Sequence, residues 1–152
     1  YGISLSYCDS KMRNCTVIGH TIGIGDANVY TNKARIENTI VAHNRDADFG
    51  LTVSSYKFEV TNICFNCCST QFVQGVNHNV VALPGLKDAA GGDYTLRGDS
   101  PCVDAGTTDV WVSITTDLTG LPHQDHNGDG IAQPDIGCFE LMPKPGSLMV
   151  VR

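Results

Sequence analysis

The sequence predicts an all-β fold in which short parallel strands wind into a solenoid. Three stretches align at an offset of 24 residues without a gap, namely MRNCTVIGH (12–20), IENTIVAHN (36–44) and VTNICFNCC (60–68). Each is rich in β-branched and apolar residues and lacks the period of a helix. A repeat of this length with short strands and turns is typical of one coil of a parallel β-solenoid. Successive coils would then stack about 4.8 Å apart.

The aligned columns predict which side chains face inward. One apolar column consists of Met12, Ile36 and Val60. Charged residues stand on either side of it, Lys11, Arg35 and Glu59 on one side and Arg13 and Glu37 on the other, which is the alternation expected of a strand with one buried face. Arg35 would lie over Glu59, and Arg13 over Glu37. We expect both to be exposed ion pairs that contribute less than about 1 kcal/mol each.

A third column of the repeat consists of asparagines, Asn14, Asn38 and Asn62. A side-chain amide can bond the identical amide on the next coil, as in stacked asparagine ladders. Asparagine also accepts the left-handed backbone of a tight turn. We therefore expect these residues to form a structural ladder along the coils.

The second half of the chain departs from the repeat. Glycine, proline and aspartate occupy turn positions after Ala82, and WVSITTDLTG (111–120) and IGCFEL (136–141) each offer one strand. We expect a single domain with β-helix coils over 1–85, a capping end over 86–142 and a tail over 143–152. Because the chain opens within the repeat at Tyr1, we expect a piece of a longer solenoid or a subunit that stacks on a partner.

Composition excludes several classes of partner. The formal net charge is −6, which disfavours nucleic acid and anionic membranes because both need a basic face. No apolar run reaches the roughly 18–20 residues of a membrane span.

The seven cysteines are odd in number, so at least one has no disulfide partner within the chain.

Four motifs in the second half occur in a distinctive order. They are GGDYTL (91–96), SPCVDAG (100–106), DLTG (117–120) and PDIGCFE (134–140). Together they resemble the C-terminal region of bacterial secreted, right-handed parallel β-helix proteins of the pectate-lyase-like type, whose endings run GDYxL–SPxIDAG–DxDG–DIGAxE. The resemblance implies a right-handed β-helix and an extracellular or cell-surface location. The chain departs from the pattern at Thr119, where aspartate is usual, and at Cys138, where a small residue is usual.

The motifs of that resemblance bring Cys102 and Cys138 onto neighbouring strands of the end structure. We expect a disulfide between them, which would close a loop of about 35 residues and contribute about 3–4 kcal/mol in the chain-entropy view. Such a bond would fit an oxidising, extracellular setting. The alternative is two buried thiols.

In the stretch DHNGDGIAQPD (125–135), residues with side-chain oxygens occupy every second position from Asp125 to Asp129, and Gly130 follows. This is the pattern of a calcium loop. The candidate Ca²⁺ ligands are Asp125, Asn127, Asp129, Ile131 through its carbonyl, Gln133 and Asp135. The place of the bidentate acid of an EF-hand holds Ile136, so the loop is a half-motif. A metal-free turn is the alternative, with Asp135 bonding backbone amides to close the end structure. His123 and His126 flank the loop and would add ligands for a softer metal.

No catalytic residue is assigned. Asp46 and Asp48 are two residues apart, but they stand in a polar loop, and no acid occupies the equivalent places in neighbouring coils. We expect a non-enzymatic secreted or cell-surface structural or binding module, with polysaccharide or other surface components as partners. The alternatives are the C-terminal part of a polysaccharide lyase or glycoside hydrolase, and a subunit that self-assembles through its solenoid ends.

Overall fold

The computed structural model describes residues 1–5, 10–26, 34–50, 58–66, 73–108 and 115–143. In these ranges the chain consists of β-strands, turns and one short 3₁₀ turn, η2 (Val76–His78), and has no α-helix. The all-β prediction is therefore confirmed. No helix in the same ranges has the length and apolarity needed to cross a membrane.

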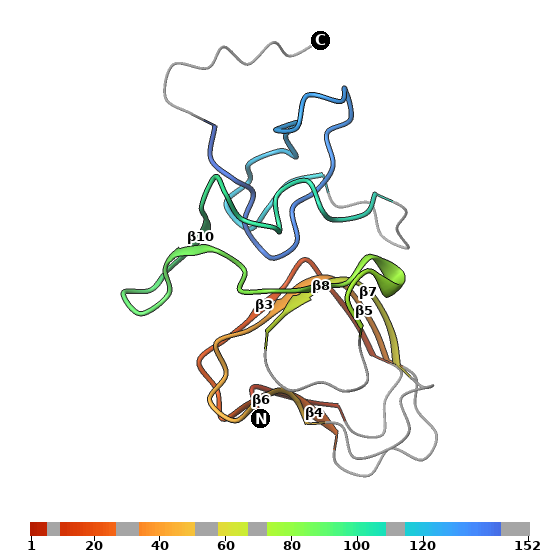
Figure 1. The fold of residues 1–152 in the computed structure, drawn as a ribbon, viewed down its shortest axis with the longest axis vertical. Helices are drawn as coiled ribbons and strands as arrows, with labels where there is room; N and C mark the ends of the chain where they lie inside the picture. The colour runs from red at the N-terminus through yellow and green to blue at the C-terminus, as the bar shows by residue number, and fades with distance from the viewer. Residues whose placement is uncertain (6–9, 27–33, 51–57, 67–72, 109–114, 144–152) are drawn as a thin grey trace.

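Two parallel sheets make up the first half, and the chain passes back and forth between them. The first has the order β1-β4-β6, and the second has the order β2-β5-β7-β8, with β3 also paired to β5. Figure 1 shows the two sheets facing each other in the lower part of the molecule. The strands are β1 (Ile3–Leu5), β2 (Ser10–Arg13), β3 (Thr16–Val17), β4 (Ile22–Asp26), β5 (Ala34–Val41), β6 (Ala47–Gly50), β7 (Phe58–Phe65) and β8 (Val80–Val81).

The register of the second sheet confirms the 24-residue repeat. Ile36 pairs with Met12 on one side and with Val60 on the other, as the alignment requires. Ile40 likewise lies between Thr16 and Cys64. The pairing is parallel throughout, so each repeat returns the chain to the same place one strand along.

An apolar core fills the space between the two sheets. Ile24 of β4, and Ile36 and Ile63 of the facing sheet, are each exposed by 1% or less. Phe49 and Phe65 meet edge to face across this core, with ring centroids 5.8 Å apart. Burying each such side chain contributes about 1.5–3 kcal/mol, so this core is a main source of stability for the two-sheet part formed by β1–β8, whose 24-residue repeats we call coils.

The C-terminal segment, residues 83–143, begins with an antiparallel pair, β9 (Leu86–Asp88) and β10 (Asp93–Leu96). In Figure 1 it lies beside the coils, against the outer face of the second sheet. A second apolar cluster joins the two parts, consisting of Ile40, Ala42, Cys64, Leu86, Leu96, Cys102 and Ile136. The segment therefore covers the flank of the coils. The strand expected over 136–141 is wrong, because 136–139 form bends and 140–141 have no regular structure. Of the strand expected over 111–120, residues 111–114 lie outside the described residues, and 115–120 contain only an isolated bridge between Thr116 and Pro122.

Residues of the asparagine column bond the second sheet to the C-terminal segment. Asn14, Asn38 and Asn62 have φ of 47°, 46° and 51°, which confirms the left-handed backbone. The expected amide-to-amide ladder is wrong. Asn38 Nδ2 donates to the Thr107 carbonyl at 3.0 Å, and Asn62 Nδ2 donates to the Ala105 carbonyl at 2.8 Å. The C-terminal segment supplies the bonding partners, because its backbone runs past the turns in an irregular conformation and needs them.

The two expected ion pairs differ in their surroundings. Arg35 Nη2 and Glu59 Oε2 are 2.8 Å apart, and the side chains are 44% and 58% exposed, which confirms an exposed pair. The prediction of an exposed Arg13–Glu37 pair is wrong, because both residues are buried, at 8% and 7% exposure. Arg13 Nη2 donates to the Thr107 carbonyl at 2.8 Å, so the C-terminal segment covers this position.

The predicted Cys102–Cys138 disulfide is also wrong, since both residues are free thiols. The two motifs do run side by side, and the Ile136 amide donates to the Cys102 carbonyl at 2.9 Å. The side chains diverge, however. Cys102 is fully buried against Cys64 on β7, whereas Gly137, with φ of 118°, turns Cys138 toward Thr16 of the first coil.

Candidate metal and ligand site in the C-terminal segment

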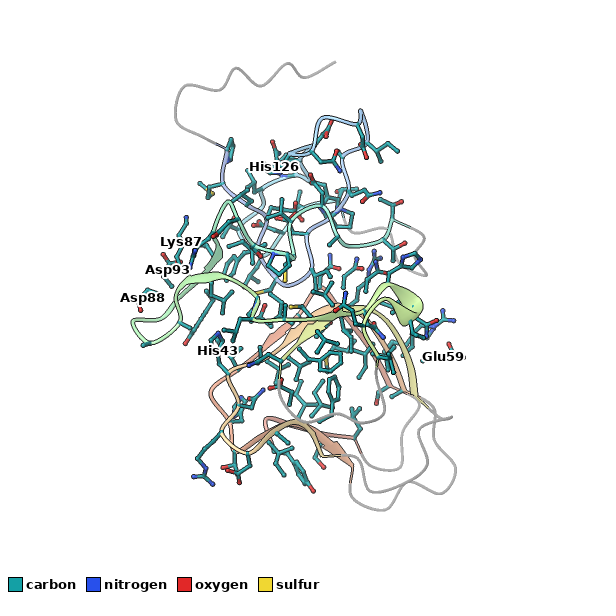
Figure 2. The ribbon with its side chains drawn as sticks, in the orientation of Figure 1. His43, Glu59, Lys87, Asp88, Asp93 and His126 are labelled. Carbon is teal, nitrogen blue, oxygen red and sulfur yellow. The ribbon has the colours of Figure 1, made fainter. Side chains whose placement is uncertain are left out.

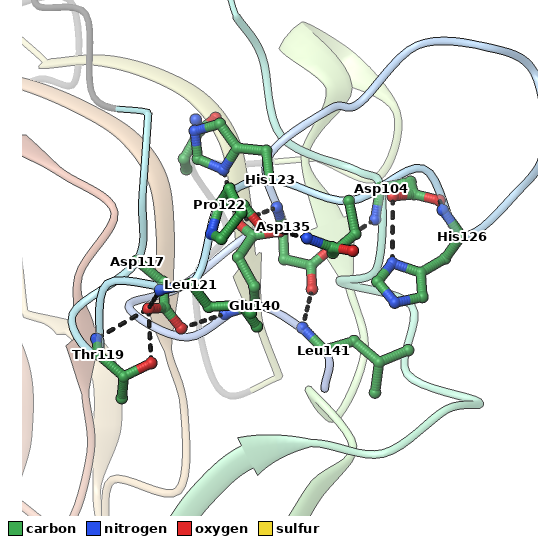
Figure 3. Close-up of polar contacts among 12 residues, drawn as sticks. Asp104, Asp117, Thr119, Leu121, Pro122, His123, His126, Asp135, Glu140 and Leu141 are labelled. Carbon is green, nitrogen blue, oxygen red and sulfur yellow. Dashed lines mark hydrogen bonds and ion pairs between the residues drawn. The ribbon is translucent and has the colours of Figure 1, made fainter. Parts of the chain in front are cut away.

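Carboxylates that are buried (Asp135, Glu140) or half-buried (Asp117) hold the C-terminal segment together. Figure 3 shows Asp117, Asp135 and Glu140 as acceptors of hydrogen bonds from backbone amides of this segment. The segment has few strands, so most of its buried amides have no sheet partner and need another acceptor. Short acidic side chains at turns provide those acceptors.

Asp135 lies at the centre of this arrangement and is 1% exposed. Its Oδ1 accepts the Asp104 amide at 2.7 Å, and its Oδ2 accepts the Leu141 amide at 2.6 Å. This confirms the alternative role of Asp135, in which it closes the end structure through backbone amides. Burial raises the pKa of its carboxyl to about 6, although the two amides act in the opposite direction.

The pKa values of Asp117 and Glu140 shift in opposite directions. Burial acts to raise the pKa of Asp117, but hydrogen bonds from Thr119, Glu140 and Leu121 together outweigh it and hold this pKa below its usual range. Burial raises the pKa of Glu140 above its usual range, although His123 Nδ1 lies 2.9 Å from its Oε1.

Asp104 has a left-handed backbone and one unsatisfied oxygen. Its φ is 50°, which aspartate and asparagine adopt more readily than most residues other than glycine. Oδ2 accepts the amides of His126 and Asn127 at 2.9 and 2.7 Å. Oδ1 is buried and has no hydrogen-bond partner. His126 Nδ1 lies 3.8 Å from Oδ1, and the side chains of Asp104 and His126 are 4% and 20% exposed.

Asp104, His126 and Asp135 form one cluster. Each offers one ligand atom, and these atoms all lie within 4.8 Å of one another. Asp104 and His126 also line a pocket of about 730 Å³, together with Lys87, Val103, Asn127, Leu141 and other residues. Figure 2 places His126 within the C-terminal segment and Lys87 on the strand β9. The cluster is therefore mostly buried but has a route to solvent.

The side chains of the predicted calcium loop accept hydrogen bonds from backbone amides of the same loop. Asp125 accepts the amides of Gly128 and Gly130 at 2.6 and 2.9 Å. Asn127 accepts the Asp129 amide, and Asp129 accepts the Ile131 amide. All of these bonds are exposed. The Ile131 carbonyl accepts the Gln133 amide at 3.0 Å.

The loop's predicted ligands therefore belong to two places. Asp125, Asn127, Asp129 and Ile131 remain in the exposed loop, and Gln133 follows them half-buried. Asp135 instead lies in the buried cluster with Asp104. Asp104 belongs to the SPCVDAG motif but was not predicted as a ligand. The only sequence signal for it is an aspartate in a turn context, Asp-Ala-Gly, that favours an unusual backbone.

Asp46 and Asp48 also have different surroundings. Asp46 is exposed and pairs with Arg45 at 2.9 Å. Asp48 is fully buried on β6, so the expectation that both acids stand in a polar loop is wrong for this residue. It accepts the side-chain amide of Asn44 at 3.0 Å and the backbone amide of Asn66 at 2.9 Å, which links two coils.

No protein-family model, curated protein or solved structure matches the chain.

Proposed function

We propose that the chain is part of a right-handed parallel β-helix and acts as a binding module without a catalytic site of its own. The main support is how the buried acids are used. Among the described residues, the buried Asp48 and Asp135 accept an amide group on each oxygen, and the buried Glu140 accepts the Asp135 amide on Oε1. Glycoside hydrolysis instead needs two carboxyl groups about 5–10 Å apart that flank a substrate.

The pocket beside Asp104 is the proposed binding surface. It combines a cation, Lys87, with apolar side chains of Val103, Leu141 and Met142. A sugar ring offers apolar faces together with hydroxyls, and an acidic sugar adds a carboxylate that Lys87 would pair. We therefore propose an acidic polysaccharide of a cell surface as the ligand class, and an extracellular location for the module.

The test is retention on immobilised acidic polysaccharide, with release of reducing ends and of unsaturated products measured in parallel. We expect retention without product, and weaker retention of Lys87→Gln. Arg97→Gln is the matched control, because Arg97 is a nearby exposed cation, paired with Asp99 and absent from the pocket lining. Product release would show an enzyme, and equal loss in both variants would show a non-specific charge effect.

Calcium is a separate part of the proposal and concerns the exposed loop over 125–131. A carboxylate oxygen that accepts one amide keeps a lone pair for a metal, so the loop's shape is compatible with Ca²⁺. Calcium at 100 times its Kd would raise the free energy of unfolding by about 2.7 kcal/mol. Melting of chelator-treated protein with and without Ca²⁺ tests this. An unchanged Tm, or an equal rise in Asp129→Asn, would contradict it.

Self-assembly is a second candidate, favoured by the open sheet edges. In the described strands β1 pairs only with β4, and β2 pairs only with β5, so both present an unpaired edge. Such edges accept strands from another copy. Sedimentation velocity over a range of concentrations would reveal stacking as a rise in mass, and a constant monomer mass would rule it out.

A further inference from the structure

We propose that Asp104, His126 and Asp135 bind a divalent first-row transition metal ion such as Mn²⁺. This site is distinct from the exposed calcium loop and does not depend on the polysaccharide-binding proposal. Its residues come from three separate parts of the chain, namely the SPCVDAG motif, the Asp/Asn/Gly loop and the PDIG motif. The site is visible only in the folded protein.

The unsatisfied oxygen of Asp104 is the observation that points to a ligand. Asp104 Oδ1 is buried without a hydrogen-bond partner, in a side chain that is only 4% exposed. Burying a charged oxygen without a partner is costly, and buried charges in proteins are usually paired or bound to a metal. Oδ2 already accepts two amides, so its position is fixed and Oδ1 is directed into the cluster.

The geometry fits a metal after a small contraction. The three ligand atoms lie within 4.8 Å of one another. A metal with bonds of about 2.1 Å holds neighbouring ligands about 3–4 Å apart. The Asp104 Oδ1 to His126 Nδ1 distance of 3.8 Å is already in this range. Asp135 takes part although each of its oxygens accepts one amide, because a carboxylate oxygen has a second lone pair.

The donor set selects the class of ion. Two carboxylates and one imidazole suit Mn²⁺, Fe²⁺, Co²⁺ or Zn²⁺, whereas Ca²⁺ prefers oxygen ligands in larger number. The backbone amides that hold Asp104 and Asp135 act as outer-shell supports that fix the ligand oxygens. The pocket lined by Asp104 and His126 provides an entry path and leaves room for water at the remaining positions.

Mn²⁺ is the probe of choice, because thiolates bind it weakly and the four described cysteines are free. The experiment titrates the full chain with Mn²⁺ and follows the loss of the free-ion EPR signal. We expect a site whose Kd rises at least about tenfold in His126→Ala and is unchanged in Asp129→Asn. The imidazole nitrogen should appear as a coupling in pulsed EPR of the complex, a signal that a purely structural histidine would not give.

Asp104→Asn is a second variant that preserves the fold. Its carbonyl can accept the same two amides as Oδ2, its NH₂ replaces the unsatisfied Oδ1, and asparagine accepts the positive φ. It should fold and lose the site. Asp129→Asn is the matched control, since Asp129 belongs to the exposed loop and is not in the cluster.

Three results would overturn the proposal. The first is no Mn²⁺ binding at millimolar concentration. The second is binding that His126→Ala and Asp104→Asn leave unchanged, and the third is binding that only Asp129→Asn abolishes, which would place the ion in the exposed loop. Retention by polysaccharide is to be measured in the presence of chelator, where this metal site is empty, so failure of this proposal is separable from failure of the proposed function.

Discussion

The coils and the C-terminal segment are stabilised by different kinds of interaction. In the coils, parallel strands satisfy the backbone and an apolar core lies between two sheets. In the C-terminal segment, few amides have a sheet partner, and carboxylates such as Asp117 and Asp135 accept them instead. The coils should therefore respond to changes in side-chain volume, and the segment to changes in charge and pH. The following predictions test this contrast.

The largest expected effect is in the coil core. Phe65 is 2% exposed and packs against Phe49, so Phe65→Ala should lower the free energy of unfolding by about 3–5 kcal/mol. Leu83→Ala is the control, because Leu83 is 57% exposed and its loss should change stability by less than about 0.5 kcal/mol. Urea unfolding followed by circular dichroism measures both. Similar values for the two would mean that the core between the sheets is not the main source of stability.

The next effect concerns pH in metal-free protein. The pKa of Asp135 is about 6 when folded, against about 3.9 when unfolded. Between these pH values the folded state keeps a proton that the unfolded state has lost. The contribution of this group to stability is therefore greatest below about pH 4 and falls by up to about 3 kcal/mol as pH rises to about 6. The raised pKa of Glu140 acts in the same direction.

Asp135→Asn should flatten this slope even if it lowers stability overall. Asp99→Asn is its control, since the Asp99 side chain is 68% exposed and should leave the slope unchanged. Unfolding free energies at several pH values in the presence of chelator give the slope. A stability that rises over the same interval in the parent, with no change in Asp135→Asn, would refute the assignment.

A smaller effect tests the junction between the two regions. Asn38 exchanges two hydrogen bonds with Thr107, whereas Asn62 makes one with Ala105. Asn38→Ala should cost about 2–3 kcal/mol, and Asn62→Ala less, because each lost bond is worth about 1 kcal/mol and alanine is strained at positive φ. Asn38→Gly removes the strain and isolates the bonds. Equal costs at the two positions in thermal unfolding would contradict this order.

The smallest effect is at the surface of the coils. Glu59→Gln removes the exposed pair with Arg35 and should change stability by less than about 0.5 kcal/mol, with the difference vanishing in 1 M salt. A double-mutant cycle with Arg35→Gln measures the coupling. A coupling above about 1 kcal/mol would mean that the pair is less solvated than its exposure indicates.

The repeat could be predicted because it is local and periodic. Each strand alternates inward and outward residues, so the columns of Met12 and Ile36 follow from spacing alone. The left-handed turns at the asparagines follow from the residue type. The expected disulfide failed for a different reason. Its two motifs are neighbours, but the turn at Gly137 sends Cys138 toward another coil.

The sequence by itself determined the all-β class, the 24-residue register of the second sheet and the turns at Asn14, Asn38 and Asn62, since these depend on residue type and short-range periodicity. Only the tertiary structure decided what lies against the outer face of that sheet. The burial of Arg13 and the cluster of Asp104 with His126 and Asp135 depend on where an irregular segment runs. Such a segment has no period, and its path follows from long-range pairing of polar groups that no local pattern specifies.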